Sequence, residues 1–209
     1  PISVIKAGSE TLQDGAINDP KIASKFLDSM ISNSERMSEM LDDLLELEKI
    51  EFGQLTLKNQ KFNVYNQINL LINSLNSIST QKKLIIKNDI NQKVKIYCDK
   101  QVFIGIFVNL LENAIKYSKF EGEINLTNEI NSNYMIIRVQ DNGYGIEKSN
   151  IKRIFDRFFR TGRARAHTKG TGLGLSLVKQ LIKTVGGDIR VESKINKGTS
   201  FFVSIPLKS

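Results

Sequence analysis

Polar side chains at helical spacing interrupt an apolar stretch near the middle of the chain. Asn109, Asn113 and Lys116 follow one another at steps of four and three, so they share one face of a helix, and Tyr117 comes next. An amide oxygen suits Mg²⁺, a hard cation that keeps several waters and binds substrate phosphates. A lysine one turn further on adds positive charge for those phosphates. Polar helix residues often simply face water, but the apolar neighbours and the two features that follow favour a ligand site.

An acidic residue followed by two glycines comes where a strand is expected to end. The segment reads Asp141-Asn142-Gly143-Tyr144-Gly145-Ile146. Such a sequence is often no more than a turn. In the functional interpretation, the carboxylate of Asp141 accepts a hydrogen bond from the amino group of a base, and the glycines let that ligand approach the backbone closely.

A glycine-rich segment, Lys169-Gly170-Thr171-Gly172-Leu173-Gly174-Leu175, precedes an expected helix. Backbone N–H groups at the start of a helix form a natural cradle for phosphate. A dinucleotide-binding fingerprint would need a strand directly before the glycines. Here the preceding segment is rich in Arg and Phe and has no clear periodicity. Long irregular segments in compact domains are usually lids or binding loops, so a lid is predicted over about residues 146–172.

Taken in this order, the three segments resemble the N, G1 and G2 boxes of sensor histidine kinases. Ile154-Phe155-Asp156-Arg157-Phe158-Phe159-Arg160 resembles the F box of that family, and Gly198-Thr199 before Phe201 resembles its final glycine box. The resemblance covers essentially the whole chain. It implies an ATP-binding α/β sandwich of the type shared with gyrase, heat-shock chaperone and mismatch-repair ATPases. It also implies a protein-histidine kinase that passes the γ-phosphoryl group of ATP to a histidine and then to an aspartate of a response regulator.

The resemblance assigns roles to the residues expected near the phosphates. Asn113 would hold Mg²⁺ with help from Asn109, and Lys116 would touch the phosphates. Arg160 is the expected contact of the γ-phosphate, with Arg157 or Arg163 as alternatives.

The resemblance also assigns an adenine pocket. Tyr117 would line it, and Asp141 would read the adenine amino group. The glycines would shape its wall and let the lid fold over the phosphates. The further nucleotide-binding positions are Gly143, Gly145, Gly170, Thr171, Gly172, Leu173, Gly174 and Thr199.

The residue type at position 109 bears on the fate of the phosphoryl group. Related ATPases that hydrolyse ATP carry a Glu there as the general base for water. Asn109 cannot take up a proton near neutral pH, which favours transfer to a protein acceptor over hydrolysis. Glu112 is close enough in sequence to keep a hydrolytic ATPase of the same superfamily open as an alternative.

Two helices are expected ahead of these motifs. Asp19-Pro20 supplies a good N-cap and first helical residue, and apolar residues then recur at steps of three, four and seven as far as Gly53. This predicts one helix of about thirty residues. Pro1 to Leu12 resembles the end of another helix, with Gly15 in the turn. Because two helices cannot bury both apolar faces alone, residues 1–53 are predicted to form half of a dimeric four-helix bundle.

The remaining residues, 54–209, alternate strand and helix patterns and form the predicted ATP-binding domain. Helices are expected at 64–78, 99–114 and 173–185. Strand patterns occur at 55–57, 84–86, 94–97, 124–126, 135–139, 189–191 and 201–205. Helices grouped against a largely antiparallel sheet make an α+β sandwich. The predicted fold class is therefore α+β, a helical hairpin followed by an α/β sandwich.

In the family, the hairpin carries the phosphate acceptor in a motif H-[ED]-x-x-[ST]-P. Pro1-Ile2-Ser3 resembles the continuation of that motif, so the acceptor is expected five residues before Pro1, outside this sequence. His167 is the one histidine, and it lies in the predicted lid without the expected acid and proline. It is expected to be a surface residue. The sequence thus predicts a truncated core that binds Mg²⁺ and ATP without phosphorylating itself.

Composition and charge narrow the range of partners. Hydrophobic residues make up 40% of the chain, which excludes a fully disordered protein, and the single Cys98 excludes an intrachain disulfide. The net charge is +8, but the lysines are scattered in short clusters such as Lys82-Lys83. No block of like charges supports a nucleic-acid partner, and no apolar run is long enough to span a membrane. The expected location is cytoplasmic, in a parent that could be membrane-anchored.

The expected partners are a second copy of the chain, through the hairpin, and the receiver domain of a response regulator. One further alternative stays open beside the hydrolytic ATPase. It is a non-catalytic dimerisation module that senses nucleotide.

Overall fold

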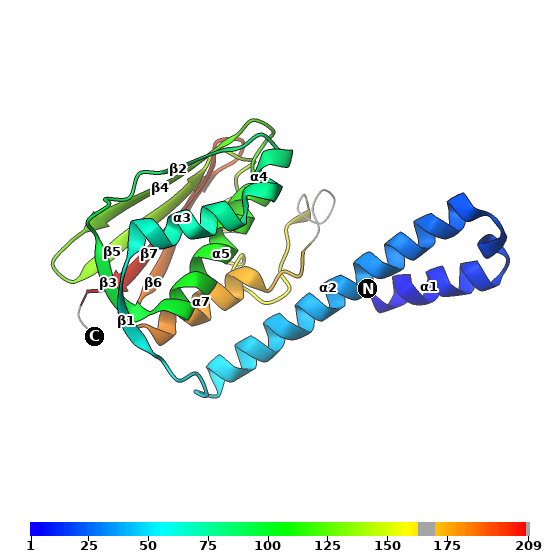
Figure 1. Cartoon of the computed structure of the whole chain (residues 1–209), viewed down its shortest axis with the longest axis horizontal. Helices are drawn as coiled ribbons and strands as arrows, with labels where there is room; N and C mark the ends of the chain where they lie inside the picture. The colour runs from blue at the N-terminus through cyan, green and yellow to red at the C-terminus, as the bar shows by residue number, and fades with distance from the viewer. Residues whose placement is uncertain (163–169, 208–209) are drawn as a thin grey trace.

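A long helix dominates the N-terminal part of the chain (Figure 1). The computed structural model describes residues 1–162 and 170–207. In it, α2 (Pro20–Glu51) has 32 residues and forms a hairpin with α1 (Ile2–Gln13) through the short η1 (Ala16–Asn18). Asp19 starts α2 as predicted, because its carboxylate accepts hydrogen bonds from the backbone N–H groups of the next turn.

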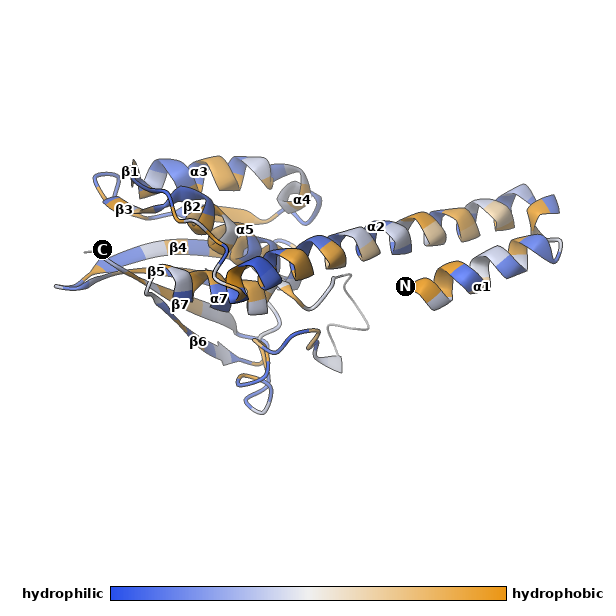
Figure 2. Ribbon diagram, turned by 90° about the horizontal axis from the view of Figure 1, so that it is seen from below, coloured by the Kyte–Doolittle hydropathy of each residue, from blue (hydrophilic) through white to orange (hydrophobic). Residues whose placement is uncertain are grey.

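The hairpin leaves large apolar side chains in contact with water, and Figure 2 shows that hydrophobic residues recur along both of its helices. The exposed ones are Ile2, Val4, Ile17, Ile22, Leu27, Ile31, Leu41 and Leu45. Leu47 and Ile50, at the C-terminal end of α2, are instead buried in the core of the following domain. Two helices offer no second layer to cover such a face, which fits the prediction of half a bundle.

A five-stranded sheet forms the base of the second part. Its strand order is β2-β4-β5-β7-β6, with β2 parallel to β4 and the other neighbours antiparallel. The strands are β2 (Ile85–Asn88), β4 (Glu123–Ile130), β5 (Tyr134–Asp141), β6 (Asp188–Lys194) and β7 (Gly198–Pro206). Helices α3 (Val64–Ser74), α5 (Lys100–Tyr117) and α7 (Gly174–Thr184) cover one face of this sheet (Figure 1). The predicted fold class is confirmed.

Two local expectations differ from the structure. No strand forms at 55–57, contrary to expectation; the first strand is β1 (Asn59–Asn63), which pairs with β3 (Lys95–Asp99) in a separate two-stranded sheet. The helix expected over 64–78 is broken at Leu75 into α3 and α4 (Asn76–Gln81). The Ser74 hydroxyl donates to the carbonyl of Leu71, and such local side-chain bonds compete with a continuous helix.

Helix α5 lies at the centre of the domain. Asp99 caps it by accepting from the N–H groups of Gln101 and Val102. Its buried side chains are Val102, Phe103, Ile106, Phe107, Leu110, Leu111, Ala114 and Ile115. Because α5 is held by apolar contacts on most of its surface, its one polar stripe has a fixed direction. Within the described ranges, no helix has the length and apolarity needed to cross a membrane.

Candidate nucleotide-binding site

A cavity of about 590 Å³ lies between α5, the glycine-rich segment and α2. This size is in the range of small-molecule sites, about 300–1,000 Å³. Most of the predicted site residues line it, namely Asn109, Asn113, Lys116, Tyr117, Asp141, Gly145, Arg160, Gly170, Thr171, Gly172, Gly174 and Thr199. Segments that are far apart in the sequence therefore meet around one cavity.

The two asparagines of α5 are held in matching orientations. The Asn109 side-chain amide donates to the carbonyl of Gly105, and that of Asn113 donates to the carbonyl of Asn109, each across 2.9 Å. An amide nitrogen can only donate, so the amide oxygens are the groups that these residues can offer to a metal ion.

Positive charge gathers on the same side of the cavity. Burial lowers the pKa of Lys116, the nearby Arg160 lowers it further, and Glu112 opposes both effects. Arg160 donates from Nη1 to the carbonyl of Gly170 across 3.1 Å. Two cations held this close are favourable where an anionic ligand compensates them.

A buried carboxylate marks another part of the cavity wall. Asp141 accepts hydrogen bonds from the backbone N–H groups of Gly143, at 2.8 Å, and of Thr199, at 3.2 Å. Burial raises the pKa of Asp141 to about 6, although both hydrogen bonds act in the opposite direction. Gly143 does not line the cavity. A Cβ there would overlap the carbonyl oxygen of Tyr117, so this glycine is needed for backbone packing.

The glycine-rich segment connects the cavity to the hairpin. Gly172 has φ +79°, a conformation that L side chains rarely adopt. Thr171 donates from its hydroxyl to Oδ2 of Asp43 across 3.0 Å, and Arg36 donates to the carbonyl of Gly170 across 2.9 Å. Leu173 is fully buried beneath the segment and does not line the cavity.

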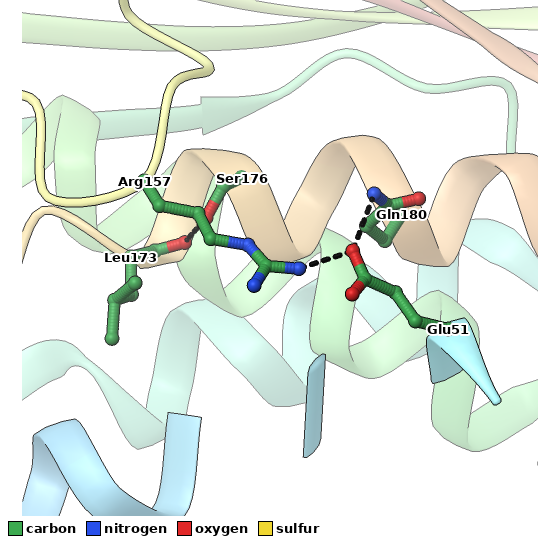
Figure 3. Close-up of polar contacts among 5 residues, drawn as sticks. All are labelled: Glu51, Arg157, Leu173, Ser176 and Gln180. Carbon is green, nitrogen blue, oxygen red and sulfur yellow. Dashed lines mark hydrogen bonds and ion pairs between the residues drawn. The ribbon is translucent and has the colours of Figure 1, made fainter. Parts of the chain in front are cut away.

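The arginines of the predicted lid have different surroundings. Arg160 lines the cavity, whereas Arg157 does not and pairs with Glu51 at the end of α2 (Figure 3). Arg163 and His167 lie outside the described residues, so the expectations about them stay predictions.

Helix α2 also reaches the cavity, which no sequence pattern predicts: Glu39 and Asp43 line it. Burial raises the pKa of Glu112, and the charges of Glu39 and Asp43 raise it further, while Lys116 lowers it. Charged residues at steps of three and four from Arg36 to Glu46 do form a recognisable stripe. That pattern alone does not distinguish a solvated face from one packed on another domain.

Two family models match the sequence. The His Kinase A (phospho-acceptor) domain matches residues 1–53, and the histidine kinase-, DNA gyrase B-, and HSP90-like ATPase matches residues 98–209. The chain belongs to the sensor histidine kinase family. The resemblance found in five sequence motifs is thereby confirmed, and the ATPase match implies that this histidine kinase domain binds ATP.

Sequence relatives agree with this assignment. Sensor histidine kinase WalK of Bacillus subtilis is 29% identical over 211 residues, which cover 100% of this chain and 34% of WalK. Sensor protein kinase WalK of Staphylococcus epidermidis is 33% identical over 211 residues, which cover 99% of this chain and 34% of the relative. The chain thus spans about a third of the length of the curated kinases it matches.

Solved structures have the same fold. The Acinetobacter baumannii histidine kinase AdeS matches 100% of this chain and 96% of its own, with 23% identity and a TM-score of 0.83. The histidine kinase ThkA, solved in complex with the response regulator protein TrrA, matches 100% of this chain and 58% of its own, with 21% identity and a TM-score of 0.81. Both therefore share the hairpin as well as the α/β domain of this histidine kinase.

A magnesium ion fits the donor set of the cavity only with help from phosphate. In the described part of the chain, no group of three or more His, Cys, Asp or Glu residues is placed to hold a metal. The amide oxygens of Asn109 and Asn113 are hard but neutral ligands. Such a pair suits an ion that arrives with a triphosphate and keeps several waters.

Proposed function

We propose that this chain is the ATP-binding core of a sensor histidine kinase that transfers the γ-phosphoryl group of ATP to a histidine, and from there to an aspartate of a response regulator. The observation that carries the proposal is the convergence of Asn113, Lys116, Arg160 and Asp141 on one cavity. In this reading, residues 1–53 form the dimerisation hairpin and residues 54–209 form the catalytic domain.

The proposed roles follow from charge and position. Asp141 accepts a hydrogen bond from the adenine amino group, beside Tyr117. Lys116 and Arg160 contact the phosphates, and the glycine-rich segment presents backbone N–H groups to them. Asn113, assisted by Asn109, would hold Mg²⁺, and the bound ion would supply positive charge to the phosphates. These residues orient and bind; none of them forms a covalent bond with phosphate.

The acceptor histidine is proposed to be supplied from outside residues 1–209. The expected product is a phosphohistidine, formed by in-line attack of an imidazole nitrogen on the γ-phosphorus with release of ADP. The helical hairpin, of which residues 1–53 form a part, is proposed to pair with a second copy through its exposed apolar face. It is also proposed to present the phosphohistidine to a response regulator. The complex of ThkA with TrrA supports the choice of that partner class.

Calorimetric titration with a non-hydrolysable ATP analogue tests the proposal. We expect magnesium-dependent binding by the wild-type chain and weaker binding by Asn113→Ala, since the amide oxygen is lost. Asn66→Ala, on α3 outside the cavity, serves as the matched control. Absence of binding by the wild-type chain would overturn the proposed function. The isolated chain is further expected to show no acid-labile phosphorylation with labelled ATP.

One observation favours hydrolysis as a second candidate function. Glu112 lines the cavity, and burial raises its pKa, so its carboxyl group is nearer to the range of a general base than an exposed Glu. Steady release of phosphate by the wild-type chain, abolished in Glu112→Gln, would establish this candidate. Phosphotransfer to a supplied histidine-bearing hairpin without such release would exclude it.

A further inference from the structure

The C-terminal end of α5 is held by a lysine from another segment. Lys82 follows α4, and its ammonium group lies among three backbone carbonyls of the last turn of α5 and its cap. Its Nζ is 2.9 Å from the carbonyl oxygen of Ile115, 2.7 Å from that of Lys116 and 3.3 Å from that of Ser118. A lysine ammonium has three hydrogens to donate, and here each has an acceptor.

The remaining carbonyls of this turn are also bound. The carbonyl of Ala114 accepts from both the N–H and the hydroxyl of Ser118. The carbonyl of Tyr117 accepts from the N–H of Tyr144, in the segment that follows Asp141, across 3.1 Å. Helices leave their last four carbonyls without intrahelical partners. In α5, Lys82 and Tyr144 together supply what the helix itself lacks.

The main chain of Lys82 makes a second contact near the end of α5. Its carbonyl accepts from the N–H of Glu121, in the connection between α5 and β4, across 2.9 Å. Its ammonium also stands at the negative end of the α5 dipole, where a cation is favourable. Burial lowers the pKa of Lys82, which agrees with a charge held against backbone instead of water.

We infer that Lys82 is a positioning residue for the nucleotide site. The turn that it caps carries Lys116 and Tyr117, which both line the cavity. The carbonyl of Tyr117 in turn holds Tyr144, next to Gly143 and Asp141. Without the ammonium, three carbonyls lose their partner at once. The backbone of Lys116 and Tyr117 is then no longer held in place.

This assignment is not contained in the family match. The ATPase model begins at residue 98, so Lys82 lies outside both matched segments. Nor does Lys82 line the cavity, so it acts through α5 and touches no ligand. The inference rests on the proposed function, because it concerns the geometry of that ATP site.

The neighbouring lysine provides a matched control. Lys83 is exposed, pairs with Glu121 across 3.7 Å and lies over the ring of Phe120. None of its described contacts is with α5. Lys82→Met and Lys83→Met therefore make the same change in charge and shape at adjacent positions. Of the two, only Lys82 has a described contact with the end of α5.

The test compares affinity for a non-hydrolysable ATP analogue, with magnesium, at a temperature where every variant is folded. We expect Lys82→Met to weaken binding about tenfold, Lys82→Arg to recover most of that loss, and Lys83→Met to bind like wild type. Val64→Ala leaves a cavity at the buried N-terminal end of α3. This variant shows whether a general loss of stability alone weakens nucleotide binding. It is expected to lower the melting temperature while leaving the affinity unchanged.

Several outcomes would overturn the inference. Wild-type affinity in folded Lys82→Met would do so, and so would equal losses of affinity in Lys82→Met and Val64→Ala at equal losses of stability. If Lys82→Met does not fold, Lys82→Gln takes its place with the same expectations.

Failure of the proposed function is distinguishable, because the wild-type chain itself would then not bind nucleotide. In that case, amide hydrogen exchange alone tests whether Lys82 holds the end of α5. Lys82→Met is expected to speed exchange of the amides at 115–118 and at Tyr144 relative to Lys83→Met, and unchanged exchange overturns the inference.

Discussion

The hydroxyl of Thr171 donates a hydrogen bond to Oδ2 of Asp43 across 3.0 Å, and this bond joins the glycine-rich segment to the long helix α2. Burial raises the pKa of Asp43, while the bond from Thr171 lowers it and the charge of Asp42 raises it. An acidic residue of the hairpin thus lies on the wall of a cavity that also contains Lys116 and Arg160. A polyphosphate entering that cavity meets this carboxylate as a like charge.

Removing that carboxylate is expected to tighten nucleotide binding. Asp43→Asn keeps the shape and a hydrogen-bond acceptor for Thr171 but removes the negative charge. We expect the affinity for an ATP analogue to rise about threefold to tenfold, with the larger effect at low salt. Titration at two ionic strengths measures this. Asp42→Asn, one residue away and exposed, makes the same charge change and is expected to have little effect; weaker binding by Asp43→Asn would show that the contact supports the nucleotide-bound arrangement instead.

A second contact fixes the end of α2 against the catalytic domain. Glu51 accepts from the guanidinium of Arg157 and, across 3.3 Å, from the side-chain amide of Gln180 on α7 (Figure 3). The pair is partly exposed, so Arg157→Met is expected to change the free energy of unfolding by about 1 kcal/mol at most. Its main expected effect is a broader range of orientations between the hairpin and the catalytic domain, because the long helix α2 loses a contact at the end where it joins that domain.

Distances between spin labels at exposed positions 25 and 129 would measure that range. Cys98 does not interfere, since its thiol is buried and burial raises its pKa to about 12, which keeps it unreactive. Arg190→Met, on the far strand β6, is the control and is expected to leave the distance distribution unchanged. An equally narrow distribution in Arg157→Met would mean that the remaining contacts of α2, among them the buried Leu47 and Ile50 and the bond from Thr171 to Asp43, fix its orientation without the ion pair.

Features that depend on near neighbours in the sequence were predictable, and features that depend on tertiary placement were not. The caps formed by Asp19 and Asp99 follow from short side chains next to a helical pattern. The contact between Asp43 and Thr171 spans 128 positions, and no local pattern says that this face of α2 meets a lid and not water. The break at Leu75 was missed because the apolar spacing continues through it, while competing hydrogen bonds of Ser74 do not change that spacing.

The same division holds within the candidate site. The residue types of Asn113 and Lys116 indicate their chemistry, because a helix fixes their relative position. Gly143 was expected to shape the ligand wall, whereas it makes room for the carbonyl of Tyr117. Lys82 belongs to no recognised motif. Its contact with α5 depends on how the connection after α4 packs against the connection between α5 and β4.

Substitution of Gly143 therefore tests packing. Gly143→Ala places a methyl group against the carbonyl of Tyr117, a backbone atom that cannot rotate away. We expect a loss of about 1–3 kcal/mol in the free energy of unfolding, together with weaker nucleotide binding. Gly162→Ala is the control, since no atom of the described residues lies within 4 Å of the added carbon. Denaturant unfolding of both variants measures the difference; equal stabilities would mean that the segment after Asp141 shifts without cost.

The raised pKa of Asp141 predicts opposite effects of pH on stability and on binding. A carboxyl group whose pKa is raised to about 6 in the folded state, from 3.8, binds more protons folded than unfolded between these values. Without nucleotide, its contribution to stability is therefore greatest below about pH 4 and declines as the pH rises to about 6. Binding of adenine favours the carboxylate, which accepts the hydrogen bond from the amino group. The affinity for an ATP analogue is thus expected to fall as the pH drops below about 6, approaching tenfold per unit.

Titrations between pH 5 and 7.5 would measure this dependence. Asp141→Asn removes the titrating group and can still accept a hydrogen bond through its amide oxygen. This variant is expected to bind more weakly at pH 7.5 but with a flatter pH profile, so that the two proteins converge toward pH 5. The triphosphate also titrates near neutral pH, and the comparison with Asp141→Asn cancels that shared contribution. If the two profiles remain parallel, Asp141 does not exchange a proton on binding, and its raised pKa does not govern the affinity.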